Sequence, residues 1–259
     1  MSDNVLNSII ESFYDTELKE RMEEPGADEP DEYQIAVAKA YKDTQRILHG
    51  IGEYEPEKKG AIKDIMEGLK KYLENSSPVE KFEDVHENLC DLWIKHFKKD
   101  FTEYGIAQKI VNMSFKYLYA IFYVKNNHDP RLSKFNDCHF TLDSYTLRWL
   151  NGYKQDGKPE CLNSKTSWSK LGKTEYRDIQ DYAKKCVGDF LPKEYNCIKA
   201  EFLIWECVKL YDVLGVWAYV EKMDNNGLVE NAKELFKEID NICLSDFMDR
   251  IKYKLENMG

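Results

Sequence analysis

The sequence predicts an all-α protein. Apolar residues recur at spacings of three and four through most of the chain, which is the period of an amphipathic helix. No stretch reads clearly as a β-strand, and no longer unit repeats. Hydrophobic residues make up 42% and charged residues 32% of the 259 positions, a balance typical of a globular protein with a substantial core. We therefore expect one globular helical unit spanning residues 1–259.

The expected helices are separated by breaks rich in Gly, Pro, Asn and Ser, and roughly nine or ten helices fit the chain. The breaks fall at 24–26, 50–56, 76–78, 126–136, 151–165, 191–192 and 224–227. The first helices are marked by apolar residues at helical spacing: Val5, Ile9 and Phe13; Ile35, Ala38, Tyr41 and Ile47; Ile62, Ile65, Leu69 and Leu73. The segment 196–220 is apolar nearly all round, which predicts a buried central helix.

Composition also restricts location and cofactors. No apolar run approaches the roughly 18 residues that span a bilayer, and the N-terminus lacks the basic start of a secretory signal, so we expect a cytoplasmic protein that does not cross a membrane. The seven cysteines form no C-x-x-C pair, which indicates reduced thiols. Cys138 precedes His139, but the spacing of zinc ligands is missing. We expect no metal and no cofactor.

The net charge of −10 argues against a protein that coats nucleic acid through bulk electrostatics. Acidic residues gather in 20–32 and near the C-terminus. Local basic surface is still compatible with the middle of the chain, where Lys95, Lys98, Lys99, Lys109 and Lys116 lie.

The most informative helix begins near Gly105. Along 106–124 the apolar residues follow one face, while Lys109, Asn112 and Lys116 form a polar stripe at its border. The two lysines are seven residues apart and therefore lie on the same side of the helix. The simplest explanation is that they extend their amines to solvent and pair with acids; the alternative is that they act chemically.

A second segment of interest follows the loop that contains Pro130. Residues 138–150 read as a short extended entry followed by a helix. Either Thr141 or Asp143 is suited to cap that helix, because a side-chain oxygen at this position accepts a bond from a free backbone N–H. An aspartate before a helix is common, so Asp143 alone identifies no function.

Together these motifs resemble the helix-hairpin-helix (HhH-GPD) DNA glycosylase superfamily, with the closest likeness in its archaeal 8-oxoguanine DNA glycosylase branch (the AGOG type). That branch has a Gln-Lys pair, a second lysine at the interval of Lys109 and Lys116, and an aspartate a little over thirty residues on; thirty-four residues separate Lys109 from Asp143. The segment 198–205 is similar to the family segment in which an acid and a tryptophan four residues later contact the extruded base. Glu201 and Trp205 occupy those positions.

The resemblance implies a two-lobed helical fold with the site in the cleft between the lobes. One lobe would span roughly 30–150, with the helix-hairpin-helix-like element at 103–124, and the other would combine the N-terminal helix with 165–259. The implied activity is that of a base-excision repair DNA glycosylase with associated AP lyase activity, acting as a monomer on a damaged purine like 8-oxoguanine that is flipped out of duplex DNA.

The resemblance also implies residue roles. Lys109 would attack C1′ and form a Schiff base with the sugar, while Asp143 would stabilise positive charge or take a proton. Burial and the positive charge of Lys116 would both lower the pKa of Lys109. The implied substrate-binding residues are Glu201, Trp205, Glu32 and Lys116, and the implied DNA-backbone contacts are Gly105 and Gln108.

Two other readings remain. The first is a catalytically silent relative that keeps the fold as a nucleic-acid-binding module; the net charge favours it, as do Glu32 in place of a base-reading glutamine and Thr141 in place of a family proline. The second is an unrelated helical protein-interaction protein. The enzyme requires Lys109 and Asp143 to face one cleft within a few ångströms, with Trp205 on its wall.

Overall fold

In the computed structural model the described residues are 2–23, 31–48, 50–75, 80–97, 100–152, 157–163, 167–190 and 195–217. Within these ranges the chain is helical and contains no strand, in agreement with the all-α prediction. The expected C-terminal part of the second lobe, residues 218–259, lies outside the described residues, as do Lys98 and Lys99.

The helices lie close to the predicted positions. The α-helices are α1 (Ser2–Glu17), α2 (Lys19–Met22), α3 (Glu32–Thr44), α4 (Glu55–Glu74), α5 (Phe82–His96), α6 (Tyr104–Lys125), α7 (Ser144–Gly152), α8 (Glu160–Asn163), α9 (Lys173–Phe190) and α10 (Cys197–Trp217). The 3-10 helices are η1 (Gln45–Ile47), η2 (Ile51–Tyr54), η3 (Pro130–Phe135) and η4 (Trp168–Lys170). Two of the predicted breaks, 126–136 and 151–165, therefore contain short helical turns, η3 and α8.

Local capping explains where several helices begin. Asp31 Oδ1 accepts hydrogen bonds from the backbone N–H groups of Tyr33 and Gln34 at 2.9 and 3.4 Å, which satisfies donors that have no partner inside α3. Pro56 lies in the first turn of α4, where its missing N–H costs nothing. Of the two candidate caps of α7, Asp143 is the one that the structure uses.

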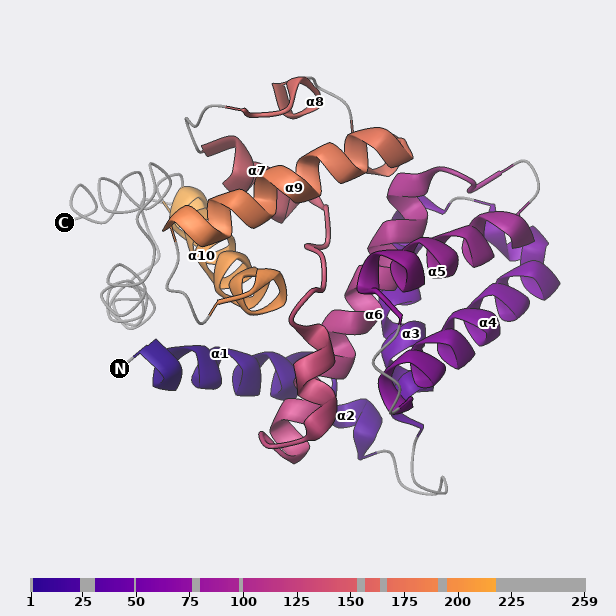
Figure 1. Ribbon diagram of the computed structural model, residues 1–259, viewed down its shortest axis with the longest axis horizontal. Coiled ribbons are helices and arrows are strands. Elements are labelled where there is room, and N and C mark those ends of the chain that lie inside the picture. The colour runs from indigo at the N-terminus through magenta and orange to yellow at the C-terminus, as the bar shows by residue number, and fades with distance from the viewer. Residues whose placement is uncertain are drawn as a thin grey trace.

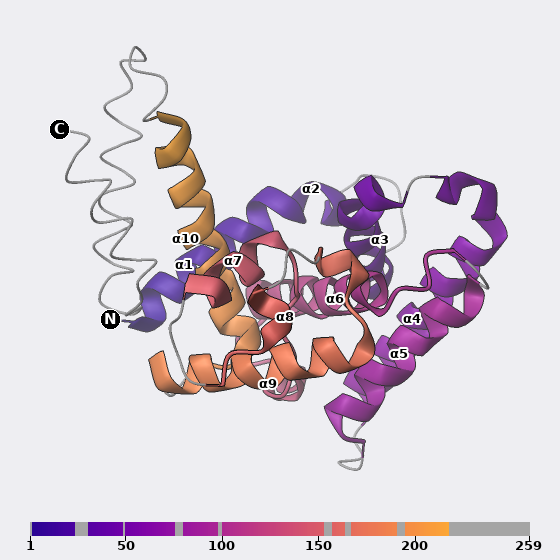
Figure 2. The same ribbon diagram turned by 90° about the horizontal axis from the view of Figure 1, so that it is seen from above.

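Helix α6 runs through the centre of the molecule and is buried from Tyr104 to Phe122. Helices α3, α4 and α5 lie on one side of it, and α1, α7, α9 and α10 lie on the other (Figures 1 and 2). Helix α3 packs along α6, α4 packs on α5, and α10 packs on α7 and α1. The helix that carries the candidate residues is therefore in contact with both halves of the structure.

Residues 138–143 cross the interior in an extended conformation, and side-chain amides take the place of a neighbouring strand. Gln180 Nε2 donates to the carbonyl of Phe140 at 2.7 Å, and its Oε1 accepts from the Phe140 N–H at 3.0 Å. Gln108 makes the same pair of bonds with Leu142, at 2.9 and 3.2 Å. Because buried backbone groups must be paired, these two glutamines make the extended segment possible.

None of the helices among the described residues combines the length and the apolar character that a bilayer crossing requires.

Candidate active site

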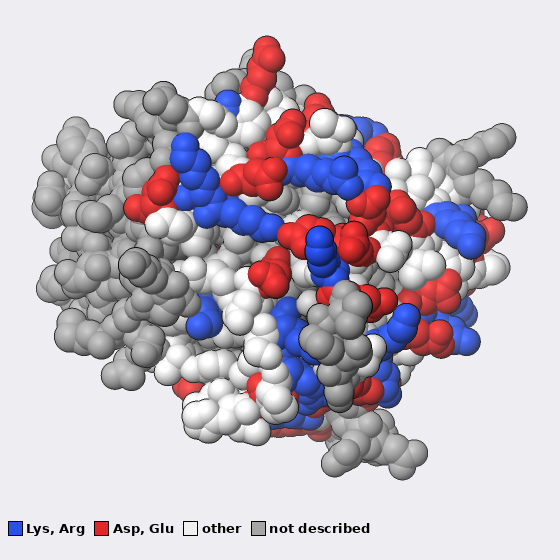
Figure 3. Space-filling view, viewed as in Figure 1, with Lys and Arg blue, Asp and Glu red and all other residues white. Residues whose placement is uncertain are grey.

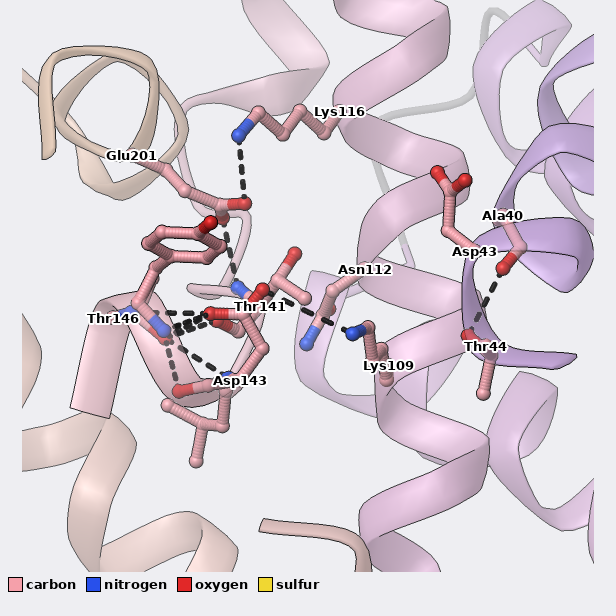
Figure 4. A network of polar contacts seen from close by, with 12 residues as sticks. Ala40, Asp43, Thr44, Lys109, Asn112, Lys116, Thr141, Asp143, Thr146 and Glu201 are labelled. Carbon is pink, nitrogen blue, oxygen red and sulfur yellow. Dashed lines mark hydrogen bonds and ion pairs between the residues drawn. The ribbon is translucent and has the colours of Figure 1, made fainter. Parts of the chain in front are cut away.

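The structure brings Lys109 and Asp143 together. Lys109 is on the second turn of α6, Asp143 immediately precedes α7, and Lys109 Nζ lies 3.9 Å from Asp143 Oδ2 (Figure 4). The other oxygen, Oδ1, accepts the N–H groups of Tyr145 and Thr146 at 2.9 and 3.1 Å. The helix cap therefore fixes the orientation of the carboxylate and turns its second oxygen toward the amine.

The Lys109 amine is largely removed from water. Its side chain is 10% exposed and that of Asp143 is 3% exposed. Burial lowers the pKa of Lys109 below the ordinary lysine value, while the carboxylates of Asp143 and Asp43 act in the opposite direction. The positive charge that assists the lowering is that of Arg46.

This arrangement corrects the expectation that Lys116 lowers the pKa of Lys109. Lys116 is two helical turns away, where Lys116 Nζ lies 3.1 Å from Glu201 Oε1. A cation paired with a carboxylate adds little positive potential at a distant site. Activation of Lys109 therefore depends on burial rather than on the second lysine.

The pair of Lys116 and Glu201 is fully buried, with side chains 0% and 1% exposed. Glu201 Oε2 accepts the Thr141 N–H at 2.8 Å, which ties α10 to the extended segment. Burial lowers the pKa of Lys116 and raises the pKa of Glu201, so both shifts favour the neutral forms. The centroid of the Trp205 ring lies 4.3 Å from Lys116 Nζ. Three of the predicted base-pocket residues thus meet, next to the segment that carries Asp143.

Four buried polar atoms in this region have no hydrogen-bond partner among the described residues: Lys116 Nζ, Glu201 Oε1, Thr141 Oγ1 and Trp205 Nε1. The contact of 3.1 Å between Lys116 and Glu201 is close enough for an ion pair, but it lacks the angle of a hydrogen bond. Buried groups without partners cost free energy, and such groups in one region indicate a place where a polar ligand or water binds.

Gly105 and Gln108 have structural roles in this structure instead of presenting donors to DNA. The Gly105 N–H donates to the Leu171 carbonyl at 2.9 Å, and a Cβ at this position would lie 2.0 Å from the Trp168 carbonyl oxygen. Glycine is required because η4 packs directly on the first turn of α6. Gln108 is fully buried, and its amide is bonded to the backbone of Leu142.

Glu32 is not part of the site. It lies at the start of α3, where its carboxylate is 2.7 Å from Lys125 Nζ and 3.6 Å from Arg131 Nη1. Lys125 is the last residue of α6, sixteen residues after Lys109, which corresponds to about 24 Å along the helix axis. The reason is the direction of α3 along α6, which places its N-terminus at the far end.

Sequence reasoning missed two of the groups that surround Lys109. The Trp168 indole lies over the amine, with 4.4 Å between Nζ and the ring centroid, and it covers the lysine from the side of η4. On the side of α3, the Tyr117 hydroxyl donates to Asp43, which also accepts from Lys39. Neither Trp168 nor Asp43 belongs to a motif, so only the packing of α3 and η4 on α6 reveals them.

The charged surface is mixed on the face shown in Figure 3. Among the described residues there, Lys and Arg side chains alternate with Asp and Glu and form no continuous basic area. In the described ranges, no three His, Cys, Asp or Glu side chains are grouped so that they could hold a metal ion.

Comparison with known proteins does not add a relative: no family model, no curated protein and no solved structure matches this chain.

Proposed function

We propose that this protein is a DNA glycosylase with AP lyase activity, in which Lys109 is the nucleophile. The observation that carries the proposal is the buried Lys109 amine, with a lowered pKa, 3.9 Å from a carboxylate whose orientation is fixed by a helix cap. A neutral amine is nucleophilic, and a fixed carboxylate can stabilise a developing sugar cation. The proximity of these two groups supports the proposal.

The reaction follows from these two groups. The neutral Lys109 amine forms a bond to C1′ of a flipped nucleotide, the bond from C1′ to the base nitrogen breaks, and the base leaves with the bonding electrons. The amine then loses its extra proton to Asp143, and Asp143 gives this proton to the sugar ring oxygen as its bond to C1′ breaks, which leaves a Schiff base between Nζ and C1′. The Asp143 carboxylate then takes the C2′ proton, and the bond from C3′ to the phosphate oxygen breaks with its electrons going to the phosphate, which is the lyase step.

The unpartnered polar atoms around Lys116 and Glu201 support a binding region for the base. Glu201 Oε1 can accept an N–H, Lys116 Nζ can donate to a carbonyl, and Trp205 offers an aromatic face. The implied substrate is a damaged purine like 8-oxoguanine, which presents both kinds of group. In this proposal roughly 30–150 is one lobe of an HhH-GPD fold and the N-terminal helix with 165–259 is the other, with the site between them and DNA as the partner.

A second candidate is a catalytically silent member of the same fold that binds nucleic acid or protein. The cover of Trp168 over Lys109 favours it, because a cation under an indole is stabilised in its protonated, non-nucleophilic form. The engaged N–H of Gly105 favours it as well, since this group is not available to a phosphate.

Borohydride trapping distinguishes the two. The full chain is incubated with duplexes that carry 8-oxoguanine, other oxidised or alkylated purines, or an abasic site, and sodium borohydride reduces any Schiff base to a stable adduct. We expect an adduct with the wild-type protein and none with Lys109→Gln, whose circular dichroism and melting temperature show whether it is folded.

The matched control is Lys95→Gln, which removes an exposed lysine on α5 that lies outside the site. It should trap like the wild type. An adduct that persists in Lys109→Gln would show that another amine reacts, and the absence of any adduct with the whole panel would overturn the enzyme and favour the silent relative.

A further inference from the structure

A cavity lies between α5, α6 and α9, and none of its lining residues belongs to the candidate active site. Its volume is about 270 Å³, and its walls include the rings of His86, Tyr104, His139 and Tyr176. Tyr176 and His86 are 1% exposed, and His139 is 8% exposed. The floor of the cavity is therefore made of four aromatic or imidazole rings.

The two histidines share one hydroxyl. The Tyr176 oxygen lies 2.9 Å from His139 Nδ1, 3.1 Å from His86 Nε2 and 2.9 Å from Asn112 Nδ2. An amide nitrogen can only donate, and a phenol has one proton, so the hydroxyl donates to one imidazole and accepts from the other. Because the hydroxyl contacts Nδ1 of His139 but Nε2 of His86, both rings carry their proton on the same nitrogen, either both on Nε2 or both on Nδ1.

The second ring nitrogen of His139, which lines the cavity, is left for a ligand. His139 Nδ1 contacts the Tyr176 hydroxyl, and the described part of the chain offers no hydrogen-bond partner to His139 Nε2. Burial lowers the pKa of His139 to about 2 and that of His86 to about 3, so both rings are neutral. Exchange of the two tautomers moves a proton through Tyr176 and also requires His86 Nδ1 to take up a proton and His139 Nε2 to release one. His139 Nε2 carries a proton in one tautomer and a lone pair in the other. It can bind either a donor or an acceptor.

The rim of the cavity adds one available carboxylate. Glu83 pairs with Lys184 at 3.1 Å, and Glu87 pairs with Lys173 and Arg177, so these charges join α5 to α9. Asp181 also lines the cavity, but it has no ion pair or hydrogen bond with any described residue. The cavity thus offers a neutral nitrogen, aromatic walls and one unpaired negative charge.

These features define the size and chemistry of a ligand. The volume is below the roughly 300–1,000 Å³ of pockets that hold drug-sized molecules, which indicates a single heterocycle rather than a nucleotide. Aromatic walls favour a planar ring. The carboxylate of Asp181 favours an amino group and repels a phosphate.

We propose that this cavity is a binding site for a free planar nitrogen heterocycle that bears an exocyclic amino group, of the size of one nucleobase. His139 Nε2 bonds to a ring nitrogen and Asp181 accepts the amino group. The site goes beyond the proposed glycosylase reaction and does not depend on it, because no residue of the Lys109 site lines the cavity.

The test uses the full chain and adenine as the probe, titrated by calorimetry. We expect saturable binding of one adenine, weaker binding of purine, which lacks the amino group, and weaker binding of AMP, which carries a phosphate. Asp181→Asn should weaken adenine binding at least tenfold, because a hydrogen bond to a charged group is lost. Asp178→Asn, an exposed residue on the same helix outside the cavity, should leave it unchanged.

Two further measurements keep the proposal open to refutation. His139→Phe keeps the ring but removes the nitrogen, and adenine binding should fall at least tenfold; if this variant does not fold, the ¹⁵N signals of His139 in the wild type should still shift on adding adenine. Lys109→Gln should bind adenine like the wild type. Three results would each overturn the proposal. The first is no heat at millimolar adenine together with unmoved His139 signals. The others are unchanged adenine binding in Asp181→Asn and loss of adenine binding in Lys109→Gln.

Discussion

The buried histidines make stability depend on pH in a way that can be calculated. The perturbation is a shift from pH 7.5 to pH 5.0, applied to the wild type and to His139→Gln. In the folded protein burial lowers the pKa of His86 to about 3 and that of His139 to about 2, from 6.5 for an ordinary histidine. A group whose folded-state pKa is lowered in this way binds its proton more readily when the chain is unfolded.

The sign and size follow from proton linkage. Above pH 6.5 both rings are neutral in the folded and the unfolded chain, so the free energy of unfolding does not change with their protonation. Below pH 6.5 the unfolded chain takes up protons that the folded chain does not, and the free energy of unfolding falls until the pH reaches the folded-state pKa of each histidine. Each pH unit in that window costs about 1.4 kcal/mol per histidine. At pH 5.0 the loss is therefore about 2 kcal/mol for each ring and about 4 kcal/mol for both.

Other groups contribute little to the comparison. The lowered pKa values of Glu83 and Glu87 destabilise the fold on acidification only below about pH 4.5, outside the chosen range. The raised pKa of Glu201 acts in the opposite direction, since a protonated Glu201 suits the buried site. Both proteins keep these carboxyls, so their effects cancel when the wild type is compared with His139→Gln.

The assay is urea unfolding followed by tryptophan fluorescence, which yields the free energy of unfolding at each pH if the slope with urea is unchanged. We expect the loss between pH 7.5 and pH 5.0 to be smaller in His139→Gln by about 2 kcal/mol, whatever its absolute stability. Equal losses in the two proteins would refute the reasoning, because they would mean that His139 is protonated in the folded state.

Three further predictions concern the candidate active site. Gly105→Ala should lower the free energy of unfolding, measured with urea, by about 1–3 kcal/mol because the added Cβ would meet the Trp168 carbonyl. An unchanged free energy of unfolding would show that η4 is not packed there. Asp143→Asn keeps the α7 cap but loses the charge, so the melting temperature should stay near the wild type while borohydride trapping slows roughly a hundredfold; parallel loss of both would contradict a chemical role. Glu201→Gln should destabilise by about 3–5 kcal/mol because Lys116 loses its counter-charge, and the double variant with Lys116→Met should recover most of this in the same unfolding assay; no recovery would contradict the pairing.

Much of the fold was predictable because it depends on neighbours in sequence. The spacing of three and four that marks helices is a property of consecutive turns, and α1, α3, α4 and α6 all lie where that spacing predicts them. A cap likewise involves residues two or three positions apart, which is why Asp143 was a candidate before the structure. The stripe of Lys109 and Lys116 on one side of α6 has the same local origin.

The partners of these residues were not predictable in the same way. Gln108 and Gln180 pair with the extended segment 138–143, and no local pattern distinguishes them from surface glutamines. The sequence placed Glu32 near the base because of the resemblance alone, whereas α3 runs along α6 with Glu32 at the opposite end from Lys109. The role of Gly105 changed as well, from a phosphate contact to a point of close packing with η4.

The sequence by itself determined that the protein is helical, where most helices begin, and that Lys109 and Lys116 share one helix face with a capping aspartate after it. Only the tertiary structure decided which acid each lysine meets. Lys109 lies beside Asp143, thirty-four residues on, and Lys116 lies beside Glu201, eighty-five residues on. Helix periodicity and capping act over a few residues, whereas an ion pair depends on how whole helices pack, and that packing is set by the shape of the buried core rather than by any single segment.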